Sequence, residues 1–445
     1  MRYFQATLGA FFLWSMGSLI MSLLPLGFVE EFTSLHSPTT SVSGSLRRSL
    51  NRADFLESGN IGKIVRINKY SYNLNLRSDN DQDLPKYWRQ WWYTSVNNLP
   101  TDRPVKFRLK GRGHWNFYVP VFSYDNIRWQ QFAERDVQKA KNNDLIFSQK
   151  FEKSKVYIAR YYPYTFTKLK KYLDRNKSNP YLKIGSMGDS LQKRNIPTLT
   201  ITDPDKTAKK SQIIVHARTH PGEVASSFLL EGSIDFLLSD HPEAKIARAN
   251  HIFRIVPMLN VDGVVVGNNR VSPEGINLEG KWDTYPRSAR LKFAEAPHEV
   301  KLFYNQILRW KRSGPPVSIA MNIHSSNGQP KDKTFFFPHF GPQSMGYSTA
   351  EVNLWNKQVS FIQKMKDVQG EEWFNRIPKH GTRAFLKRSV PESWWWKVSR
   401  GKTMALTIEA TFGKAGDTNN WIRPNQIRII GKSMVQAMGG VLEGY

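Results

Sequence analysis

The 445-residue sequence predicts an α/β fold in which a mixed-sheet domain follows an antiparallel β-sandwich domain. Short aromatic and β-branched runs, separated by Asn, Asp, Gly and Pro clusters, occupy residues 51–165, and this pattern is typical of a β-sandwich. From residue 166 onward, strand-like runs alternate with helical patterns. That alternation indicates a mixed or parallel sheet covered by helices. We therefore expect two domains, at residues 51–165 and 166–445.

The first 29 residues carry one charge, Arg2, ahead of an uncharged run rich in Leu, Phe and Met. A positive residue before an apolar run of this length is typical of a secretory signal or an N-terminal membrane anchor. No Ala-x-Ala cleavage site is evident, so both interpretations remain open. Either one predicts an exported protein that is periplasmic, secreted or anchored through residues 4–28. Residues 30–50, rich in Ser and Thr, are expected to form a linker.

Composition limits the possible functional sites. The chain has no Cys, which excludes disulfides, thiolate metal ligands and thiol nucleophiles. A transition-metal site has to be built from His, Asp and Glu. The formal net charge of +27 favours anionic partners. Because no nucleic-acid-binding module is recognisable, we expect adaptation to an anionic envelope rather than nucleic-acid binding.

Secondary structure follows from the spacing of apolar residues. In the first domain, strands are predicted at residues 69–77, 91–96, 105–109, 115–122 and 156–160. The aromatic residues at 88–93 form either a binding platform or, more commonly for such residues, part of the core. In the second domain, helices are predicted at 164–176, 224–238, 297–312, 349–368 and 426–442, and strands at 198–202, 213–216, 252–258, 317–323 and 404–409.

A strand-to-helix turn is the first candidate site. The apolar run that starts at Ile213 breaks at Pro221-Gly222, and His220 and Glu223 stand in this turn, three residues apart. A His nitrogen and a carboxylate oxygen are two of the three protein ligands that an open catalytic zinc site needs. Sheets in α/β proteins also carry their chemistry at strand ends. Short motifs of this kind occur by chance in ordinary polar turns as well.

Polar residues also end or follow three other apolar runs. His324 follows residues 317–323, Glu409 closes residues 404–408, and Arg270 follows the run at 252–258. A buried charge such as that of Glu409 is costly unless it is paired or used. This set fits metal-assisted hydrolysis, which would use two His and one Glu as metal ligands, a free Glu as a base, and an Arg. Zinc would lower the pKa of a bound water to about 7. Glu409 would move its proton, and Arg270 would stabilise the oxyanion.

Several ordered motifs also resemble a known family. They are His-Pro-Gly-Glu at 220–223, Pro-Met-Leu-Asn-Val-Asp-Gly-Val at 257–264, Gly-Asn-Asn-Arg at 267–270, Asn-Ile-His-Ser at 322–325 and Thr-Ile-Glu-Ala-Thr-Phe-Gly at 407–413. Together they resemble the zinc carboxypeptidases, closest to the cytosolic carboxypeptidase subfamily, whose members trim glutamates from tubulin tails. Residues 55–60, 90–93 and 162–165 resemble the β-sandwich domain that precedes the catalytic domain in that subfamily.

The resemblance implies a role for each residue of the candidate site. It implies that His220, Glu223 and His324 bind Zn²⁺, that Arg270 polarises the scissile carbonyl, and that Glu409 is the general base and acid. It also implies that residues 166–445 form a zinc carboxypeptidase-like catalytic domain.

Two departures from the family pattern bear on the substrate. Glu279 and Gly280 stand where an Asn-Arg pair that grips the terminal carboxylate is expected. A bidentate Arg clamp is lost and a negative charge is added. The hypothesis is that the substrate end carries an ammonium that Glu279 accepts, or that Lys281, Arg287 or Arg290 replaces the missing cation. A shifted local alignment is the alternative.

The second departure is the absence of the family's substrate-capping tyrosine. No Tyr lies between Tyr347 and Tyr445, and three Trp at 394–396 stand in the expected region. These Trp either wall the substrate pocket or pack in a core.

The leading prediction is an exported zinc metallocarboxypeptidase that removes C-terminal residues from an anionic peptide or cell-wall peptide. Its predicted substrate-binding residues are Arg270, Glu279 and Lys281. A cell-wall peptide amidase or N-acyl amide deacylase is one alternative. A non-catalytic envelope-binding protein is another, although the complete set of site residues argues against it.

Overall fold

The computed structural model describes residues 56–113, 116–206, 209–285, 288–325 and 332–442. The predicted leader and linker, residues 1–50, lie outside these ranges. Phe55–Tyr445 forms one compact unit. No helix in the described ranges has the length and apolarity that a membrane span requires.

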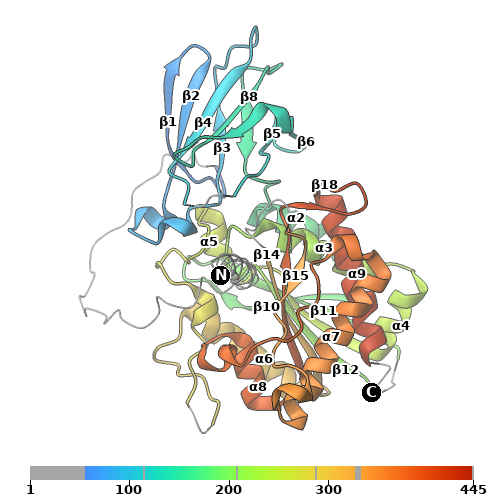
Figure 1. Cartoon of the computed structure of the whole chain (residues 1–445). Coiled ribbons are helices and arrows are strands. Elements are labelled where there is room, and N and C mark those ends of the chain that lie inside the picture. The colour runs from blue at the N-terminus through green and yellow to red at the C-terminus, as the bar shows by residue number, and fades with distance from the viewer. Residues whose placement is uncertain (1–55, 114–115, 207–208, 286–287, 326–331, 443–445) are drawn as a thin grey trace, which may run out of the picture. The chain divides into compact units, whose positions relative to one another are not determined.

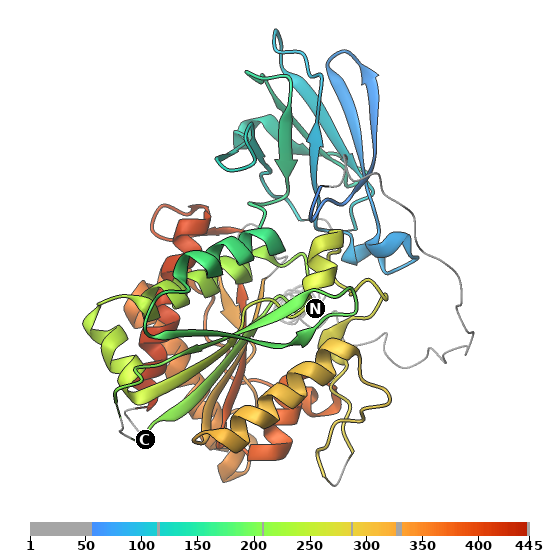
Figure 2. The same ribbon diagram turned by 180° about the vertical axis from the view of Figure 1, so that it is seen from behind.

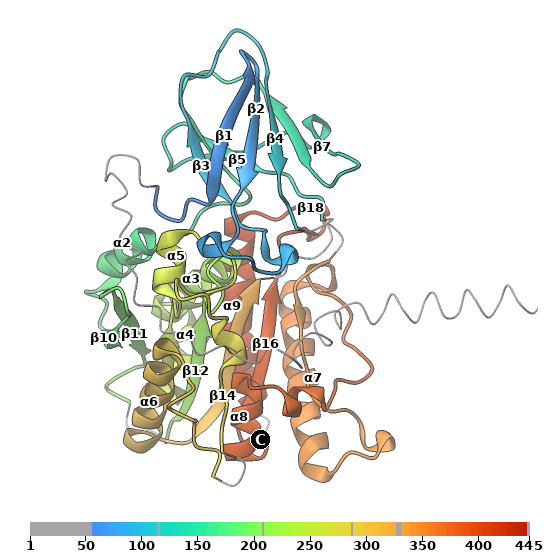
Figure 3. The same ribbon diagram turned by 90° about the vertical axis from the view of Figure 1, so that its left-hand side faces the viewer.

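The N-terminal part of this unit consists of two β-sheets (Figure 3). One sheet has the strand order β1-β2-β4-β8-β7 and the other β3-β9-β5-β6. The strands are β1 Ile61–Asn68, β2 Ser71–Leu76, β3 Tyr93–Val96, β4 Val105–Lys110, β5 Val121–Ser123, β6 Trp129–Gln131, β7 Val137–Lys139, β8 Leu145–Gln149 and β9 Val156–Ala159.

The predicted antiparallel β-rich domain is confirmed, with one pair that departs from the pattern. Strands β2 and β4 pair in parallel. The chain between them passes through β3 of the other sheet, and parallel neighbours need such a crossover connection. Trp92 is fully buried and stacks on Phe147 with ring centroids 5.8 Å apart. Trp91 and Tyr93 are buried as well, so these aromatic residues form part of the core.

A mixed seven-stranded sheet follows, and it confirms the predicted α/β class. Its order is β10-β11-β13-β12-β14-β16-β15, and the neighbours β13, β12, β14 and β16 run parallel. Figures 1 and 2 show helices packed on both faces of this twisted sheet. The strands are β10 Leu182–Asp189, β11 Asn195–Ile201, β12 Ser211–Ala217, β13 His251–Val256, β14 Val317–Ser325, β15 Phe335–Phe336 and β16 Met404–Ala410.

The helices of this part of the chain are α2 Phe166–Asn176, α3 Val224–Leu238, α4 Pro242–Asn250, α5 Val261–Val266, α6 His298–Ser313, α7 Thr349–Gln369, α8 Pro391–Ser399 and α9 Pro424–Leu442. Helices α2, α3, α6, α7 and α9 agree closely with the predicted ranges, whereas α4, α5 and α8 were not predicted. A short β17–β18 pair joins Lys414–Ala415 to Asn420–Trp421. The predicted domain boundary between residues 165 and 166 falls just before α2 and stays a prediction.

Helix α3, which begins directly after the candidate metal turn, packs tightly against α9. Nearly all of its residues are buried, and the buried Glu231 accepts a hydrogen bond from Arg428 of α9 at 2.9 Å. The two backbones meet at glycines. A Cβ on Gly232 would lie 2.0 Å from the carbonyl oxygen of Arg428, and one on Gly431 would lie 1.9 Å from that of Leu229. This close approach holds the middle of α3 against α9.

Substitution of either contact glycine should therefore destabilise the fold. We expect Gly232→Ala to lower the free energy of unfolding by about 1–3 kcal/mol, because rigid backbone atoms block the added methyl group. Gly439→Ala in the same helix pair is the matched control, since open space surrounds that position. It should be neutral or stabilise by up to about 1 kcal/mol through helix propensity. Urea unfolding of both variants checks this, and equal effects would contradict it.

Candidate metal centre and active site

The parallel strands bring the predicted site residues to one edge of the sheet. Strand β12 ends at Ala217, and the turn that carries His220 and Glu223 follows before α3 begins. On the neighbouring strand β14, His324 lies in register with Glu409 of β16. Strand ends of a parallel sheet meet at the same edge, which explains how residues almost 200 positions apart converge.

Three buried side chains point donor atoms at one another. Glu223 lies between the two imidazoles: its Oε1 is 2.8 Å from Nδ1 of His220, and its Oε2 is 2.8 Å from Nδ1 of His324. The two Nδ1 atoms are 3.1 Å apart. One donor atom from each residue lies within 4.8 Å of the others. The predicted ligand set is therefore assembled in space.

The electrostatics of this cluster favour a cation. Burial opposes ionisation of Glu223, but His220 and His324 hold its pKa well below its usual range. Burial also opposes a charge on His324, yet Glu223 and Glu279 hold its pKa well above its usual range. A site that draws positive charge, with two imidazole nitrogens and a carboxylate, fits Zn²⁺ in an open catalytic arrangement. Zinc is therefore the cofactor that this donor set suits.

Arg270 and Glu409 border the cluster, as the sequence predicted. Arg270 Nη1 lies 3.7 Å from Glu223 Oε1, and its guanidinium lies 5.8 Å from the ring centre of Trp88. Burial, followed by the negative charge of Glu223, raises the pKa of Glu409 to about 8. A carboxylate with a raised pKa is suited to accept and return a proton near neutral pH.

Asp79, which no sequence pattern marked, fixes the segment that carries Arg270. Its Oδ1 accepts the backbone N–H of Asn269 at 2.7 Å, and its Oδ2 accepts those of Arg270 at 2.6 Å and Val271 at 3.1 Å. The backbone N–H of Trp91 donates to the Asn269 side chain at 2.9 Å. Asp79 and Trp91 both lie in the connection between β2 and β4, so the N-terminal sheets help to build the active site.

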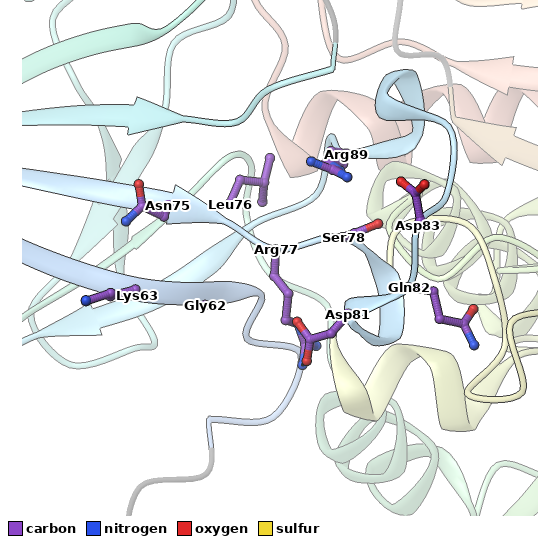
Figure 4. A pocket seen from close by; sticks show the side chains of 10 residues that line it. All are labelled: Gly62, Lys63, Asn75, Leu76, Arg77, Ser78, Asp81, Gln82, Asp83 and Arg89. Atoms are coloured by element: carbon purple, nitrogen blue, oxygen red, sulfur yellow. The ribbon is translucent and has the colours of Figure 1, made fainter.

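The same connection borders a surface pocket, shown in Figure 4. Arg77 and Asp81 lie side by side there, with Arg77 Nη1 3.9 Å from Asp81 Oδ2. Arg77 also donates a hydrogen bond to the carbonyl of Val266 at 2.8 Å. None of the predicted site residues lines this pocket.

The short 3-10 turn Leu278–Gly280 brings only part of the predicted substrate set to the metal centre. Glu279 Oε2 lies 3.3 Å from Nε2 of His324. Lys281 and Arg290 are exposed, and Arg287 lies outside the described residues. Asn277, which no sequence pattern marked, places its Oδ1 3.1 Å from Nε2 of His220.

A buried polar network behind Glu279 was also missed. Asn322 donates to Glu279 Oε1 at 2.9 Å and to Glu392 Oε1 at 3.1 Å. Thr407 donates to the same Glu392 oxygen at 2.7 Å. Burial, followed by the charge of Glu279, raises the pKa of Glu392. In the sequence, Glu392 was marked only as a carboxylate at the start of a helix, a feature that is common and unspecific.

The three Trp at 394–396 belong to the core. All are at most 8% exposed. Trp394 packs against Trp282 with ring centroids 5.9 Å apart and donates its indole N–H to the carbonyl of Ala289 at 3.0 Å. Of the two interpretations of this run, the structure supports packing.

Comparisons with known proteins agree with this geometry. The zinc carboxypeptidase family profile matches residues 169–301, and that of the cytosolic carboxypeptidase N-terminal domain matches residues 53–161. Mouse cytosolic carboxypeptidase 2 is 34% identical over 258 residues, covering 51% of this chain and 30% of the relative. Human cytosolic carboxypeptidase 6 is 34% identical over 245 residues, covering 51% of this chain and 48% of the relative.

Solved structures show the same fold. A Pseudomonas aeruginosa metallo-carboxypeptidase, in complex with (2-guanidinoethylmercapto)succinic acid, aligns with a TM-score of 0.71 at 24% identity, covering 88% of this chain and 98% of that one. A Burkholderia cenocepacia metallo-carboxypeptidase aligns with a TM-score of 0.70 at 21% identity, covering 87% and 97%.

Over residues 169–301 the chain is similar to the zinc carboxypeptidases, and its fold is that of the metallo-carboxypeptidases described above. Its N-terminal sheets match the domain that characterises the cytosolic carboxypeptidases. The matched region spans less than half of the length of the curated relatives described above.

The predicted export of the protein is contradicted by these comparisons. The matched curated relatives are named as cytosolic carboxypeptidases rather than as periplasmic, secreted or membrane-anchored enzymes. That prediction rested on the apolar composition of residues 1–29, which lie outside the described residues. Composition alone does not distinguish an exported leader from other apolar segments.

Asp79 provides a test of how the Arg270 segment is held. We expect Asp79→Asn to lower kcat/KM for peptide hydrolysis by about 100-fold, because a misplaced charge-stabilising group is costly in catalysis. Zinc content should not change, since Asp79 contacts no metal ligand directly. Asp144→Asn removes a buried carboxylate of the same sheets and is the matched control. Equal losses in the two variants, or none in either, would contradict the assignment.

Proposed function

We propose that the protein is a zinc-dependent metallocarboxypeptidase that removes C-terminal residues from a peptide substrate. The observation that carries this proposal is the convergence of His220, Glu223 and His324 beside Glu409 and Arg270. The match to the zinc carboxypeptidase profile and the names of the relatives support the same reaction class.

The residues of the site have distinct roles in this proposal. His220, Glu223 and His324 hold Zn²⁺, which supplies a Lewis acid that acidifies water and polarises a carbonyl. Glu409 takes a proton from the attacking water as the new C–O bond forms, and delivers it to the leaving nitrogen as the C–N bond breaks. Arg270 stabilises the negative charge that develops on the carbonyl oxygen.

The substrate end is proposed to differ from a plain α-carboxylate. Glu279 lies beside the metal ligands and adds negative charge there, which suits a substrate ammonium. Arg270 and Lys281 complete the proposed substrate-binding set, although the Lys281 side chain is exposed. Neither an anionic substrate nor a membrane tether through residues 4–28 gains support from the described residues, and neither enters the proposal.

The reaction is tested with a mixed substrate panel and product mass spectrometry. The panel contains peptides ending in Glu, Lys, an amide or a diamino acid, together with cell-wall fragments. We expect release of single C-terminal residues, and a rate loss of about 10²–10⁴-fold in Glu409→Gln with zinc content retained. A chelator should abolish the activity, and added zinc should restore it.

Other outcomes of this panel would replace the proposal. Cleavage of carboxyl-blocked substrates would identify an amidase or an N-acyl amide deacylase. Zinc binding without cleavage of any substrate, in the wild type as in Glu409→Gln, would favour a non-catalytic binding protein.

Residue 280 tests the substrate end. A side chain at Gly280 would meet nothing within 4 Å of its Cβ, so Gly280→Arg should be tolerated. An added guanidinium can pair with a carboxylate, and we expect kcat/KM for peptides ending in a plain α-carboxylate to rise about tenfold relative to those ending in a diamino acid. Gly439→Arg, in α9, adds the same charge in open space and is the control. If this ratio is equal in the two variants, the specificity hypothesis fails.

A further inference from the structure

Both candidate metal-binding imidazoles are engaged at both of their nitrogens. Their Nδ1 atoms face each other and the Glu223 carboxylate. Their Nε2 atoms face outward, toward one short turn: Asn277 Oδ1 lies 3.1 Å from His220, and Glu279 Oε2 lies 3.3 Å from His324. Asn277 and the turn Leu278–Gly280 therefore lie next to both imidazoles, on the side away from the metal centre.

Glu279 is held in place by its neighbours. Its Oε1 accepts a hydrogen bond from Asn322 at 2.9 Å, and its backbone N–H donates to Asn277 Oδ1 at 3.2 Å. Its side chain is only 15% exposed. Within the described part of the chain, Oε2 makes no hydrogen bond of normal geometry, and Nε2 of the His324 ring lies 3.3 Å from it. A carboxylate oxygen buried in this way requires a hydrogen-bonding or cationic partner.

We propose that Glu279 is a positioning residue for the metal centre. It accepts the Nε2–H of His324, which fixes the ring orientation and the tautomer that leaves the Nδ1 lone pair free for the metal. Outer carboxylates of this kind also increase the basicity of a metal-binding histidine. The two imidazoles then differ in basicity, because Nε2 of His220 faces the neutral amide of Asn277, whereas Nε2 of His324 faces the charged carboxylate of Glu279.

This inference rests on the proposed metal site and gives Glu279 a role beyond substrate contact. A residue that only contacts substrate would change KM and leave metal affinity unaltered. A residue that positions His324 changes metal affinity with no substrate present. Metal affinity therefore separates the two roles.

The experiment measures the zinc affinity of the full chain by competition with a chromogenic chelator. The variants are Glu279→Gln and Glu279→Asp. Glu392→Gln is the matched control, because Glu392 bonds to the same Asn322 and is buried. We expect Glu279→Gln to weaken zinc binding by about 10–100-fold, Glu279→Asp to restore part of the loss, and Glu392→Gln to stay within about twofold of the wild type.

Two further readouts distinguish positioning from general damage to the fold. The visible absorption spectrum of the Co²⁺-substituted protein should shift in Glu279→Gln and not in Glu392→Gln. Thermal unfolding of the metal-free proteins should be alike for the wild type and both Glu279 variants.

Equal zinc affinity in the wild type and Glu279→Gln would overturn the inference, and a change in KM alone would leave Glu279 as a substrate contact. Weaker zinc binding in Glu279→Gln without peptide cleavage by the wild type would support the inference while the proposed function fails.

Discussion

The burial of the Glu223 carboxylate between two imidazoles is the constraint on which the site depends. Removing an isolated charge from water costs several kcal/mol even after relaxation, so the surroundings must provide positive charge. Here His220, His324 and the guanidinium of Arg270 surround it, while Glu279 adds further negative charge beside His324. Because buried carboxylates outnumber permanent cations here, the cluster favours binding of a divalent metal ion.

The fold positions the residues of the site in two ways. The parallel register of β12, β14 and β16 sets His324 opposite Glu409 and next to the turn that carries Glu223. The rest of the site is held from outside the sheet, where Asp79 binds three successive backbone N–H groups around Arg270. The N-terminal sheets therefore contribute to the active site as well as to stability, and the family match extends over both parts of the chain.

The sequence predicted what local patterns determine. Helix α3 was predicted to the residue, since apolar spacing and the Pro221-Gly222 break mark its start. The candidate metal-binding residues were singled out because they stand at the ends of predicted strands, and Glu409 because a buried charge is costly unless it is paired or used. The contacts of Asp79, Asn277 and Glu392 could not be predicted, because each depends on tertiary neighbours far along the chain. Apolar composition, on the other hand, predicted export, which the relatives contradict.

The central claim is that two imidazoles and one carboxylate bind a single zinc ion. X-ray absorption at the zinc edge of the loaded full-length protein tests it most directly. A first shell of nitrogen and oxygen atoms at about 2.0–2.2 Å is expected. The spectrum should also contain the outer-shell features of two imidazoles, and Glu223→Ala should remove the metal. A spectrum with fewer than two imidazoles, or zinc retained at full occupancy in Glu223→Ala, would contradict the claim.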